Sequence, residues 1–259
     1  MPKTISILGC GWLGLPLAQS LLKNGFRVSG STTSPDKVEV LKNAGIEPFL
    51  INIENSISRI DEFLKADILI ISITSKNTDA FKNLLLKIGN SPVQKVIFFS
   101  STSVYGDSAK VVTEESPVSG SLAEIEALFK NSTSFQTTIL RFGGLLGGTR
   151  HPGSFFTNKI VLEPDAPVNF IHRTDCIRII EAVIANNVWG ETFNCCADTH
   201  PTKREFYTHC AISLGLEPPQ FADKSNGGFK AVSNAKLKER LQFQFSFPDV
   251  MNLPQPEDF

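Results

Sequence analysis

Three glycines near the amino terminus have the spacing of a phosphate-binding loop. Gly9, Gly11 and Gly14 follow the apolar stretch ISIL and precede a helix-like segment, in the order GCGWLG. In such a loop the first glycine makes a tight turn, the second lets a pyrophosphate approach the backbone, and the third lets the helix pack on the strand. Free N–H groups at the helix N-terminus would bind the phosphates. The alternative is a glycine-rich turn without a ligand. The residues predicted to contact a dinucleotide here are Gly9, Cys10, Gly11, Trp12, Leu13 and Gly14.

A carboxylate is expected at the end of the second strand, about 20 residues later, where it would bind the ribose 2′-hydroxyl. The sequence there is GSTTSPDK, with Ser31, Thr32 and Thr33 in place of the acid. Without a carboxylate to repel it, a 2′-phosphate can be held by these hydroxyls and Lys37. The cofactor is therefore predicted to be NADP or NAD. The preference for NADP is only slight, because no arginine is present to bind a 2′-phosphate. These residues can equally be turn residues, with Ser34 as a helix cap.

The elements that must position these groups alternate regularly over the first part of the chain. Apolar runs this continuous are buried on both faces, as in a parallel sheet. Alternation of strand and helix predicts an α/β fold, a three-layer Rossmann-type doubly wound parallel sheet of order 3-2-1-4-5-6. Strands are predicted at 5–8, 26–31, 47–52, 66–73, 94–100 and 137–142. Helices are predicted at 13–25, 35–45, 56–66, 79–89 and 121–130, with Gly25, Gly45 and Gly89 as residues that end helices.

The regular pattern changes after residue 142. The stretch GGLLGGTRHPG at 143–153 is predicted to be a loop, since five of its residues are glycine. A strand at 169–172, a helix at 175–186, a seventh strand in ETFNCCA and a helix at 203–215 follow. The predicted domains are an NAD(P)-binding core at 1–142, to which 168–198 returns, and a small, reduced substrate-side region at 143–259.

Composition excludes several classes of protein. The chain has 259 residues, of which 41% are hydrophobic and 20% charged, and its formal net charge is −1. No basic patch for nucleic acid or an anionic membrane is indicated. The amino terminus enters a strand without an apolar leader, and the apolar runs are too short to span a bilayer. Five cysteines without a CxxC pair predict reduced, buried thiols in a cytoplasmic protein, and no metal site.

One longer stretch, QKVIFFSSTSVYGD at 94–107, resembles the extended short-chain dehydrogenase/reductases, the group of nucleotide-sugar epimerases and dehydratases. The resemblance continues in order along nearly the whole chain, through LRFGG, NFIHRTDC, ETFNCCAD and NAKLKERLQFQF. It implies a serine or threonine at the strand end that polarises a substrate oxygen. It also implies a Tyr-xxx-Lys pair, in which the tyrosine is the general acid/base and the lysine lowers its pKa.

The Tyr-xxx-Lys pair is missing from this sequence. Pro117 and Glu126 align with the residues that flank the pair, which places Val118 at the tyrosine position and Leu122 at the lysine position. No other register supplies a tyrosine, because residues 106–135 contain none. A positioned proton donor contributes about 10²- to 10⁴-fold to rate. The chain is therefore identified as an atypical member of the extended superfamily, a branch that GCGWLGLPLA also resembles.

The resemblance assigns further candidate residues. The serine that polarises the substrate aligns with Ser101; Tyr105 borders the substrate and is more easily explained as structural; His172 is a weak candidate for proton transfer. The residues expected to contact the cofactor from the later strand ends are Ser72, Ile73, Thr74, Ser100, Phe142 and Gly143. Asp175 is expected to cap the helix after NFIH.

Two functions remain open. One is an oxidoreductase or nucleotide-sugar epimerase/dehydratase that uses Ser101 and a replacement donor, such as water or a histidine. The other is a non-catalytic NAD(P)-binding sensor or regulatory protein. The sequence leans slightly to the enzyme. Arg150, Arg173 and Arg178 would suit a phosphorylated or nucleotide-sugar ligand, although exposed arginines are common. By resemblance, the helices after the fourth and fifth strands would pair subunits in a possible homodimer.

Overall fold

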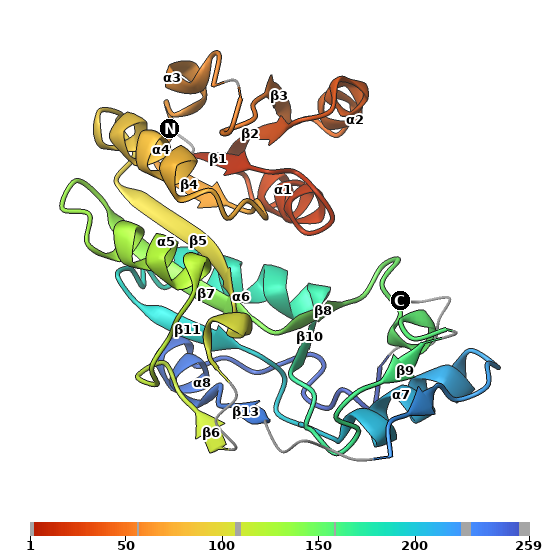
Figure 1. The fold of residues 1–259 in the computed structure, drawn as a ribbon. Helices are drawn as coiled ribbons and strands as arrows, with labels where there is room; N and C mark the ends of the chain where they lie inside the picture. The colour runs from red at the N-terminus through yellow and green to blue at the C-terminus, as the bar shows by residue number, and fades with distance from the viewer. Residues whose placement is uncertain (1–2, 56, 107–109, 158, 224–228, 254–259) are drawn as a thin grey trace. The chain divides into compact units, whose positions relative to one another are not determined.

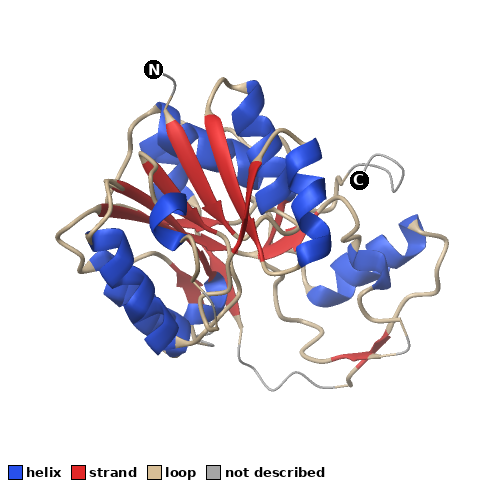
Figure 2. Ribbon diagram, turned by 90° about the horizontal axis from the view of Figure 1, so that it is seen from above, coloured by secondary structure: helices blue, strands red, loops and turns tan. Residues whose placement is uncertain are grey.

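A seven-stranded parallel sheet organises the chain (Figures 1 and 2). The computed structural model describes residues 3–55, 57–106, 110–157, 159–223 and 229–253. The strand order is β11-β7-β5-β4-β1-β2-β3, with helices on both sides of the sheet, and it confirms the predicted doubly wound α/β fold and its seventh strand. The strands are β1 (Thr4–Leu8), β2 (Arg27–Thr32), β3 (Glu47–Leu50), β4 (Ile68–Ile71), β5 (Lys95–Ser101), β7 (Gln136–Phe142) and β11 (Thr192–Cys195).

Helices alternate with these strands as predicted, and α7 and α8 follow the last strand, β11. The helices are α1 (Gly14–Lys23), α2 (Val38–Asn43), α3 (Ile60–Phe63), α4 (Thr78–Gly89), α5 (Ser121–Lys130), α6 (Arg173–Ala185), α7 (Lys203–Ser213) and α8 (Ala235–Leu241). Three short 3₁₀ turns are η1 (Pro35–Lys37), η2 (Thr102–Val104) and η3 (Pro152–Ser154). The predicted helix at 56–66 is shorter than expected; its first residue lies outside the described residues.

Three two-stranded parallel ladders complete the secondary structure. They join β6 (Lys110–Val112) to β13 (Lys230–Val232), β8 (Gly144–Leu146) to β10 (Phe170–His172), and β9 (Ile160–Val161) to β12 (Gln220–Phe221). The prediction of a loop throughout 143–153 is therefore wrong for Gly144–Leu146. The glycine-rich composition gave no indication of β8, because its partner strand β10 lies 26 residues further along the chain.

The chain divides into two compact units. Unit 1 comprises Met1–Ser100, Ser119–Leu140 and Ile180–Thr192; unit 2 comprises Ser101–Val118, Arg141–Ile179 and Phe193–Phe259. The expected division was a boundary at residue 142 with a return at 168–198. Residues 101–118 group with unit 2 because β6 pairs with β13, a partner more than 100 residues away in sequence.

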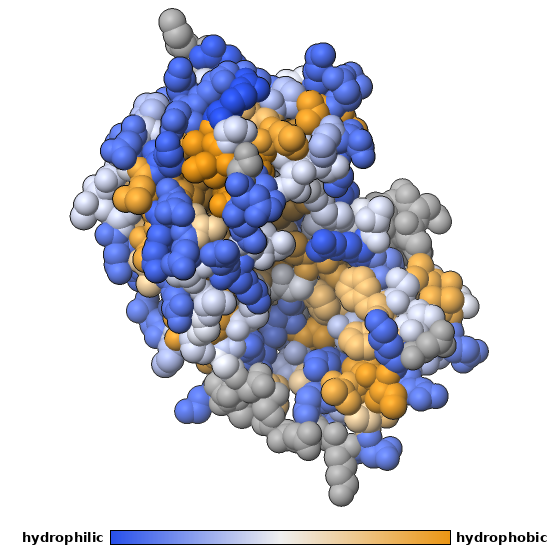
Figure 3. All heavy atoms as spheres, turned by 45° about the horizontal axis from the view of Figure 1, so that its top comes forward, coloured by the Kyte–Doolittle hydropathy of each residue, from blue (hydrophilic) through white to orange (hydrophobic). Residues whose placement is uncertain are grey.

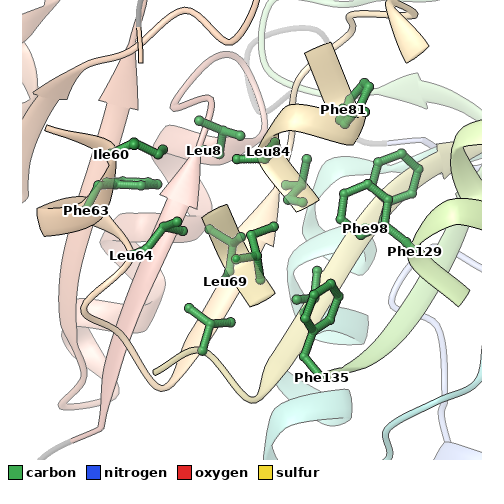
Figure 4. Packing of buried hydrophobic residues seen from close by; sticks show 14 of the residues in the cluster. Leu8, Ile60, Phe63, Leu64, Leu69, Phe81, Leu84, Phe98, Phe129 and Phe135 are labelled. Atoms are coloured by element: carbon green, nitrogen blue, oxygen red, sulfur yellow. The ribbon is translucent and has the colours of Figure 1, made fainter. Parts of the chain in front are cut away.

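An aromatic cluster forms the core of unit 1 on the side of the sheet that α3, α4 and α5 cover (Figure 4). The rings of Phe98 on β5 and Phe129 on α5 are stacked with centroids 4.9 Å apart. Phe81 on α4 meets both rings edge-on, at 5.9 Å from each. Offset-stacked and edge-on pairs are the favourable geometries for such rings. The sheet and the helices that carry the candidate site are thus held together by large buried side chains.

Two of the three glycines predicted to end helices have the expected backbone. Gly25 and Gly45 have φ values of +83° and +78°, in the left-handed region that favours glycine. The prediction for Gly89 is wrong, because this residue is still in α4 and Asn90 ends the helix. The side-chain amide of Asn90 donates to the carbonyl of Leu86 at 3.0 Å.

A second core in unit 2 contains aromatic residues from β10 and α7. The ring centroids of Phe170 and Phe206 are 4.9 Å apart in a stacked arrangement, and those of Tyr207 and Phe156 are 4.7 Å apart.

Hydrophobic side chains also reach the surface of the molecule. Figure 3 shows them at its lower right, and β9 and α7 lie at the lower right of Figure 1. None of the helices in the described ranges combines the length and apolar character that a membrane crossing requires.

We expect Phe129→Ala to lower the free energy of unfolding by about 3–5 kcal/mol, because it removes a ring packed against Phe81, Phe98 and Phe135. The matched control is Leu86→Ala, since Leu86 lies on α4 and 68% of it is exposed. That change should alter the free energy by no more than about 0.5 kcal/mol. Urea denaturation measures both. Equal losses would contradict the assignment of the core.

Candidate functional site

A side chain would fit at one of the three glycines of the first loop but not at the other two. Gly9 has a φ of +100°, and a Cβ on it would lie 2.7 Å from the carbonyl oxygen of Ser72. A Cβ on Gly14 would lie 2.2 Å from the carbonyl oxygen of Gly9. A Cβ on Gly11 would meet no heavy atom within 4 Å. Gly9 and Gly14 are therefore required by the protein itself, whereas Gly11 leaves open surface at the start of α1, as a bound pyrophosphate requires.

Ser31 holds this loop in place from the end of β2. Its hydroxyl accepts a hydrogen bond from the Gly9 N–H at 2.9 Å, and its carbonyl accepts one from the Cys10 N–H at 2.7 Å. Ser31 is only 1% exposed, so its side chain is directed to the loop instead of to solvent. Cys10 is also buried, and burial raises the pKa of its thiol to about 12. Both residues support the loop from within.

The other hydroxyls at the end of β2 separate into one internal and one exposed group. The hydroxyl of Thr32 accepts a hydrogen bond from the Ser34 N–H at 3.1 Å. Ser34 itself makes no side-chain cap, so the expected capping role is wrong, although Pro35 begins η1 as expected. Thr33 and Lys37 are exposed. Asp36, next to Lys37, is exposed as well, so a hydroxyl, a carboxylate and an ammonium face solvent where a 2′-phosphate was predicted.

The segment after β4 lies against the same loop. The Ser72 N–H donates to the carbonyl of Leu8 at 2.8 Å, which continues the pairing of β4 with β1. Ser72 and Ile73 are the groups that a side chain on Gly9 would strike, and Thr74 is exposed. Within unit 1 the fold thus brings together three predicted cofactor segments, 9–14, 31–33 and 72–74. In the loop Leu13 is buried and Trp12 half-buried.

A buried hydrogen bond joins the end of β5 to α5 within unit 1. The hydroxyl of Ser100 donates to the carboxylate of Glu126, and both residues are buried. Leu122, at the expected lysine position one turn earlier, packs partly against the aromatic core. An apolar side chain therefore stands where an ammonium group was expected. Ser100 was predicted to contact the cofactor, and its hydroxyl is directed to Glu126.

Ser101 and Val118 belong to unit 2. The hydroxyl of Ser101, at the end of β5, accepts a hydrogen bond from the Ser103 N–H at 3.1 Å, which starts η2. Ser101 is half-buried and keeps a proton to donate. Val118 forms an isolated antiparallel bridge with Tyr105 and is 37% exposed. The expected tyrosine position is thus filled by an aliphatic side chain that reaches the surface.

The phenol of Tyr105 is enclosed in a polar network. It donates to the side-chain oxygen of Asn194 at 2.7 Å and accepts from Nη1 of Arg141 at 2.7 Å. The Arg141 guanidinium also lies over the Tyr105 ring, 5.0 Å from its centroid. Burial raises the pKa of the phenol, while the hydrogen bond from Arg141 opposes that rise. The proton of Tyr105 is directed to Asn194, which favours a structural role over proton transfer to a substrate.

Sequence reasoning missed the partners of this network. The Glu114 carboxylate accepts from the Asn194 N–H at 2.7 Å, and the Lys230 ammonium donates to the Tyr105 carbonyl at 2.6 Å. Arg141 further donates to the Glu114 carbonyl at 3.3 Å. These residues come from distant parts of the chain, so no local spacing could have indicated them. Lys230 is an ammonium beside Tyr105, but it contacts the backbone and not the phenol.

Gly143 and Gly144 are needed by neighbouring residues of unit 2. A Cβ on Gly143 would lie 2.5 Å from the carbonyl oxygen of Asn169 and 2.8 Å from the sulfur of Cys196. A Cβ on Gly144 would lie 2.2 Å from the Phe170 ring. Internal packing accounts for them, and the contact of Phe142 and Gly143 with a cofactor stays a prediction.

His172 and Asp175 fix the start of α6 in unit 2. Nδ1 of His172 accepts a hydrogen bond from the Thr174 N–H at 3.3 Å, and the imidazole packs on the Phe247 ring at 4.2 Å. Burial lowers the pKa of His172, which keeps the ring neutral near pH 7. The expected capping role of Asp175 is wrong: its carboxylate accepts from the N–H groups of Ser246 at 2.7 Å and Phe247 at 2.9 Å. It anchors the carboxyl-terminal segment.

The five cysteines are buried and free. Burial raises the pKa of Cys10, Cys196 and Cys210 to about 12, so these thiols are neutral and poor nucleophiles. Within the described ranges, no three or more His, Cys, Asp or Glu side chains lie together as metal ligands would. The chemistry available here is that of hydroxyls, backbone amides and arginines.

Residues 4–124 match the model of the NAD-binding domain of 6-phosphogluconate dehydrogenase. The protein YeeZ of Escherichia coli strain K12 is 34% identical to this chain over 271 aligned positions, which cover 97% of the chain and 99% of YeeZ. The chain belongs to the YeeZ family. Its amino-terminal part is an NAD-binding domain, in agreement with the open glycine loop described above.

Solved structures agree with this assignment. A protein from Methylobacillus flagellatus, assigned to the NAD-dependent epimerases/dehydratases, is 25% identical and superimposes with a TM-score of 0.77 over 96% of this chain and 95% of that one. The UDP-glucuronic acid 4-epimerase of Bacillus cereus, solved with UDP-glucuronic acid and NAD, is 19% identical with a TM-score of 0.78 and coverage of 98% and 97%. The latter shows the fold alone. The chain is thus an NAD(P)-binding, atypical short-chain dehydrogenase/reductase-like protein.

We expect Gly11→Ala and Gly14→Ala to have opposite consequences. Gly11→Ala should leave the stability unchanged or slightly higher, because its Cβ meets nothing, but lower NAD affinity by about tenfold or more. Gly14→Ala should lower the free energy of unfolding by roughly 1–3 kcal/mol, because its Cβ overlaps the Gly9 carbonyl. Urea denaturation and cofactor titrations followed by Trp12 fluorescence measure the two effects. Unchanged NAD affinity in Gly11→Ala would contradict the proposed approach of the pyrophosphate.

We expect Tyr105→Phe to lower the free energy of unfolding by about 1–3 kcal/mol. It removes the hydroxyl that links Arg141 to Asn194 in a buried setting. The control is Ser103→Ala, an exposed change in the same turn, which should be nearly neutral. Urea denaturation measures both variants. If Tyr105→Phe is as stable as the wild type, the network does not hold unit 2 together as described.

Proposed function

We propose that this protein is an NADP(H)-preferring oxidoreductase or epimerase-type enzyme that acts on a small molecule without the usual Tyr-xxx-Lys pair. The observation that carries this proposal is the loop in which Gly9 and Gly14 are packed and Gly11 is open. That arrangement suits a dinucleotide and has no other evident use in the protein. A bound nicotinamide would supply or take up a hydride at a substrate carbon.

Ser101 is the residue proposed to act on the substrate. Its hydroxyl accepts one hydrogen bond from the backbone and has its own proton to give to a substrate oxygen. Such a donor stabilises negative charge that develops on the oxygen during hydride transfer. The substrate oxygen would finally take up a proton from water. Val118 and Leu122 have no acidic proton to give, and the phenol of Tyr105 donates its proton to Asn194. Loss of the usual acid/base predicts slow turnover.

A preference for NADP is supported by the end of β2. Thr33 and Lys37 are exposed there, and the first carboxylate, that of Asp36, comes only after Pro35, in η1. Ser31 and Thr32 would not contribute, because their side chains are buried, with 1% and 8% exposed. An ammonium and a hydroxyl are together a modest phosphate site, so both cofactors are expected to bind.

A second function is supported by a different observation. Aliphatic side chains occupy both positions of the proton-handling pair, and the nearest phenol is directed to Asn194 and Arg141. A non-catalytic NAD(P)-binding sensor or regulatory protein would need the glycine loop but no acid or base. This candidate differs from the first in one measurable property, turnover.

The remaining features of the proposal concern the surroundings of the protein. Five free, buried cysteines suit a reducing cytoplasm. The substrate is proposed to be a phosphorylated or nucleotide-sugar compound, and neither nucleic acid nor a membrane is proposed as a partner.

A homodimer through α4 and α5 is supported by exposed Leu86 and by a groove of about 320 Å³ lined by Leu85, Gly89, Leu128 and Ser132. Light scattering of the purified protein gives its mass in solution.

We expect Thr33→Asp to weaken NADP binding by about tenfold or more and to leave NAD binding equal or stronger. The new carboxylate would repel a 2′-phosphate and accept a hydrogen bond from a 2′-hydroxyl. The control is Asn90→Asp, which adds the same charge at the exposed end of α4. Fluorescence titration with both cofactors measures the ratio. A parallel loss of both affinities, or none, would contradict the placement of the 2′-position.

The enzyme proposal predicts measurable oxidation of NADPH or NADH with some member of a panel of carbonyl compounds and nucleotide sugars. We expect Ser101→Ala to lower that turnover by about 10²-fold, the effect of removing one donor from a developing oxyanion. Ser103→Ala, two residues away and exposed, should leave it unchanged. Activity that survives Ser101→Ala would remove the role given to that serine. Tight cofactor binding without turnover throughout the panel would favour the sensor.

A further inference from the structure

A side-chain hydrogen bond joins two loops of unit 1 that follow strands on opposite sides of β1 and β2. The hydroxyl of Ser75, four residues after β4 ends, donates to Oε1 of Glu54, four residues after β3 ends, at 2.5 Å. Because β1 and β2 lie between them in the sheet, β3 and β4 are about 14 Å apart, at about 4.8 Å per strand. The two loops therefore converge past the carboxyl ends of β1 and β2.

Both ends of this contact are fixed by neighbouring residues. The Glu54 N–H donates to Oδ1 of Asn52 at 3.0 Å. The Ser75 hydroxyl accepts a hydrogen bond from the Asn77 N–H at 3.1 Å, and the side chain of Asn77 caps α4. A hydroxyl has one proton, so Ser75 directs it to Glu54. The protein thus sets the position of the Glu54 carboxylate before any ligand binds.

The two joined loops border the cofactor loop and the end of β2. The loop after β4 lies against Gly9, where a Cβ would strike the Ser72 carbonyl. The Ile51 N–H donates to the Thr32 carbonyl at 3.0 Å, which sets the start of the other loop beside the end of β2. The ribose 2′-position is proposed to lie at this end of β2. The base is bonded to the carbon next to C2′, so it lies close to the same strand end.

One oxygen of the Glu54 carboxylate is available to a ligand. Glu54 is exposed, and among the described residues only Ser75 donates to its side chain. An ionised carboxylate accepts hydrogen bonds and donates none. Adenine carries an exocyclic amino group, which is a donor, whereas hypoxanthine has a carbonyl oxygen at the same position. The carboxylate therefore suits adenine and opposes hypoxanthine.

We propose that Glu54 is a specificity-determining residue of the cofactor site, where its Oε2 accepts a hydrogen bond from the exocyclic amino group of adenine. Ser75 is a positioning residue that holds the carboxylate through Oε1. With hypoxanthine the hydrogen bond is lost, and a carbonyl oxygen faces the negative charge. The inference rests on the proposed function only in requiring a dinucleotide at loop 9–14, and it does not depend on turnover.

The test compares NAD with its hypoxanthine analogue in calorimetric titrations of the full-length chain. The two ligands carry the same charge, so long-range electrostatic effects cancel in the ratio of their dissociation constants. We expect the wild type to bind NAD about tenfold more tightly than the analogue. Glu54→Gln should abolish or reverse this preference, because its oxygen can still accept from Ser75 while its amide donates to the hypoxanthine carbonyl. Ser75→Ala should reduce the preference by less, since the carboxylate remains.

The matched control is Glu47→Gln. It removes the same charge from an exposed residue of unit 1, at the other end of β3, and should keep the preference of the wild type. Thermal unfolding of each variant shows that it is folded, and Ser75→Ala supplies the test if Glu54→Gln does not fold.

Three results would overturn the role of Glu54. They are equal binding of the two ligands by the wild type, an unchanged preference in Glu54→Gln, and the same loss of preference in Glu47→Gln. Weaker binding of both ligands by one factor in Glu54→Gln would leave the residue a purely structural role. Absence of NAD binding in the wild type would refute the proposed function itself, whereas NAD binding without the preference would refute the role of Glu54 alone.

Discussion

The close contact between Gly14 and the carbonyl of Gly9 is the constraint on which the candidate site depends. It brings the start of α1 against the end of β1 with no room for a side chain on either residue. Gly11 then leaves open surface beside the start of α1, because a Cβ there would meet no heavy atom within 4 Å. Ser31 holds the loop from β2, and the backbone after β4 closes it from the other side. A pyrophosphate can approach this surface because no side chain is present at position 11. The partial positive charge of the helix N-terminus favours the negative charge of the pyrophosphate.

A different constraint shapes unit 2. Burying a phenol, a guanidinium and an amide together is costly unless each is hydrogen-bonded. Tyr105, Arg141 and Asn194 satisfy one another, and Glu114 and Lys230 bind the adjoining backbone. The tyrosine of the SVYG stretch is thereby a structural residue of unit 2. Its phenol is held by Asn194 and Arg141 and therefore does not replace the tyrosine of the missing Tyr-xxx-Lys pair.

Glycines serve three distinct purposes in this chain, and spacing alone does not tell them apart. At position 11 the glycine leaves surface for a ligand. At 143 and 144 it admits Asn169, Cys196 and Phe170 from the chain itself, and at 147 and 148 it combines a left-handed turn with space for His172 and Arg173. The difference lies in what a Cβ would meet. The atoms that it would meet belong to residues that are distant in sequence.

The sequence by itself determined the order of strands and helices and the glycine loop, because these are encoded by local periodicity and short spacing. The aliphatic residues at 118 and 122 and the relationship to the extended dehydrogenases followed from the resemblance of short motifs to that family. It could not reveal that Ser31 and Thr32 turn inward, that Asp175 anchors residues 246 and 247, or that Gly144–Leu146 is a strand. Those outcomes were decided by tertiary structure. Hydrogen-bond partners and ladder neighbours in these cases lie from 2 to 72 residues away, and only the folded chain brings them within bonding distance.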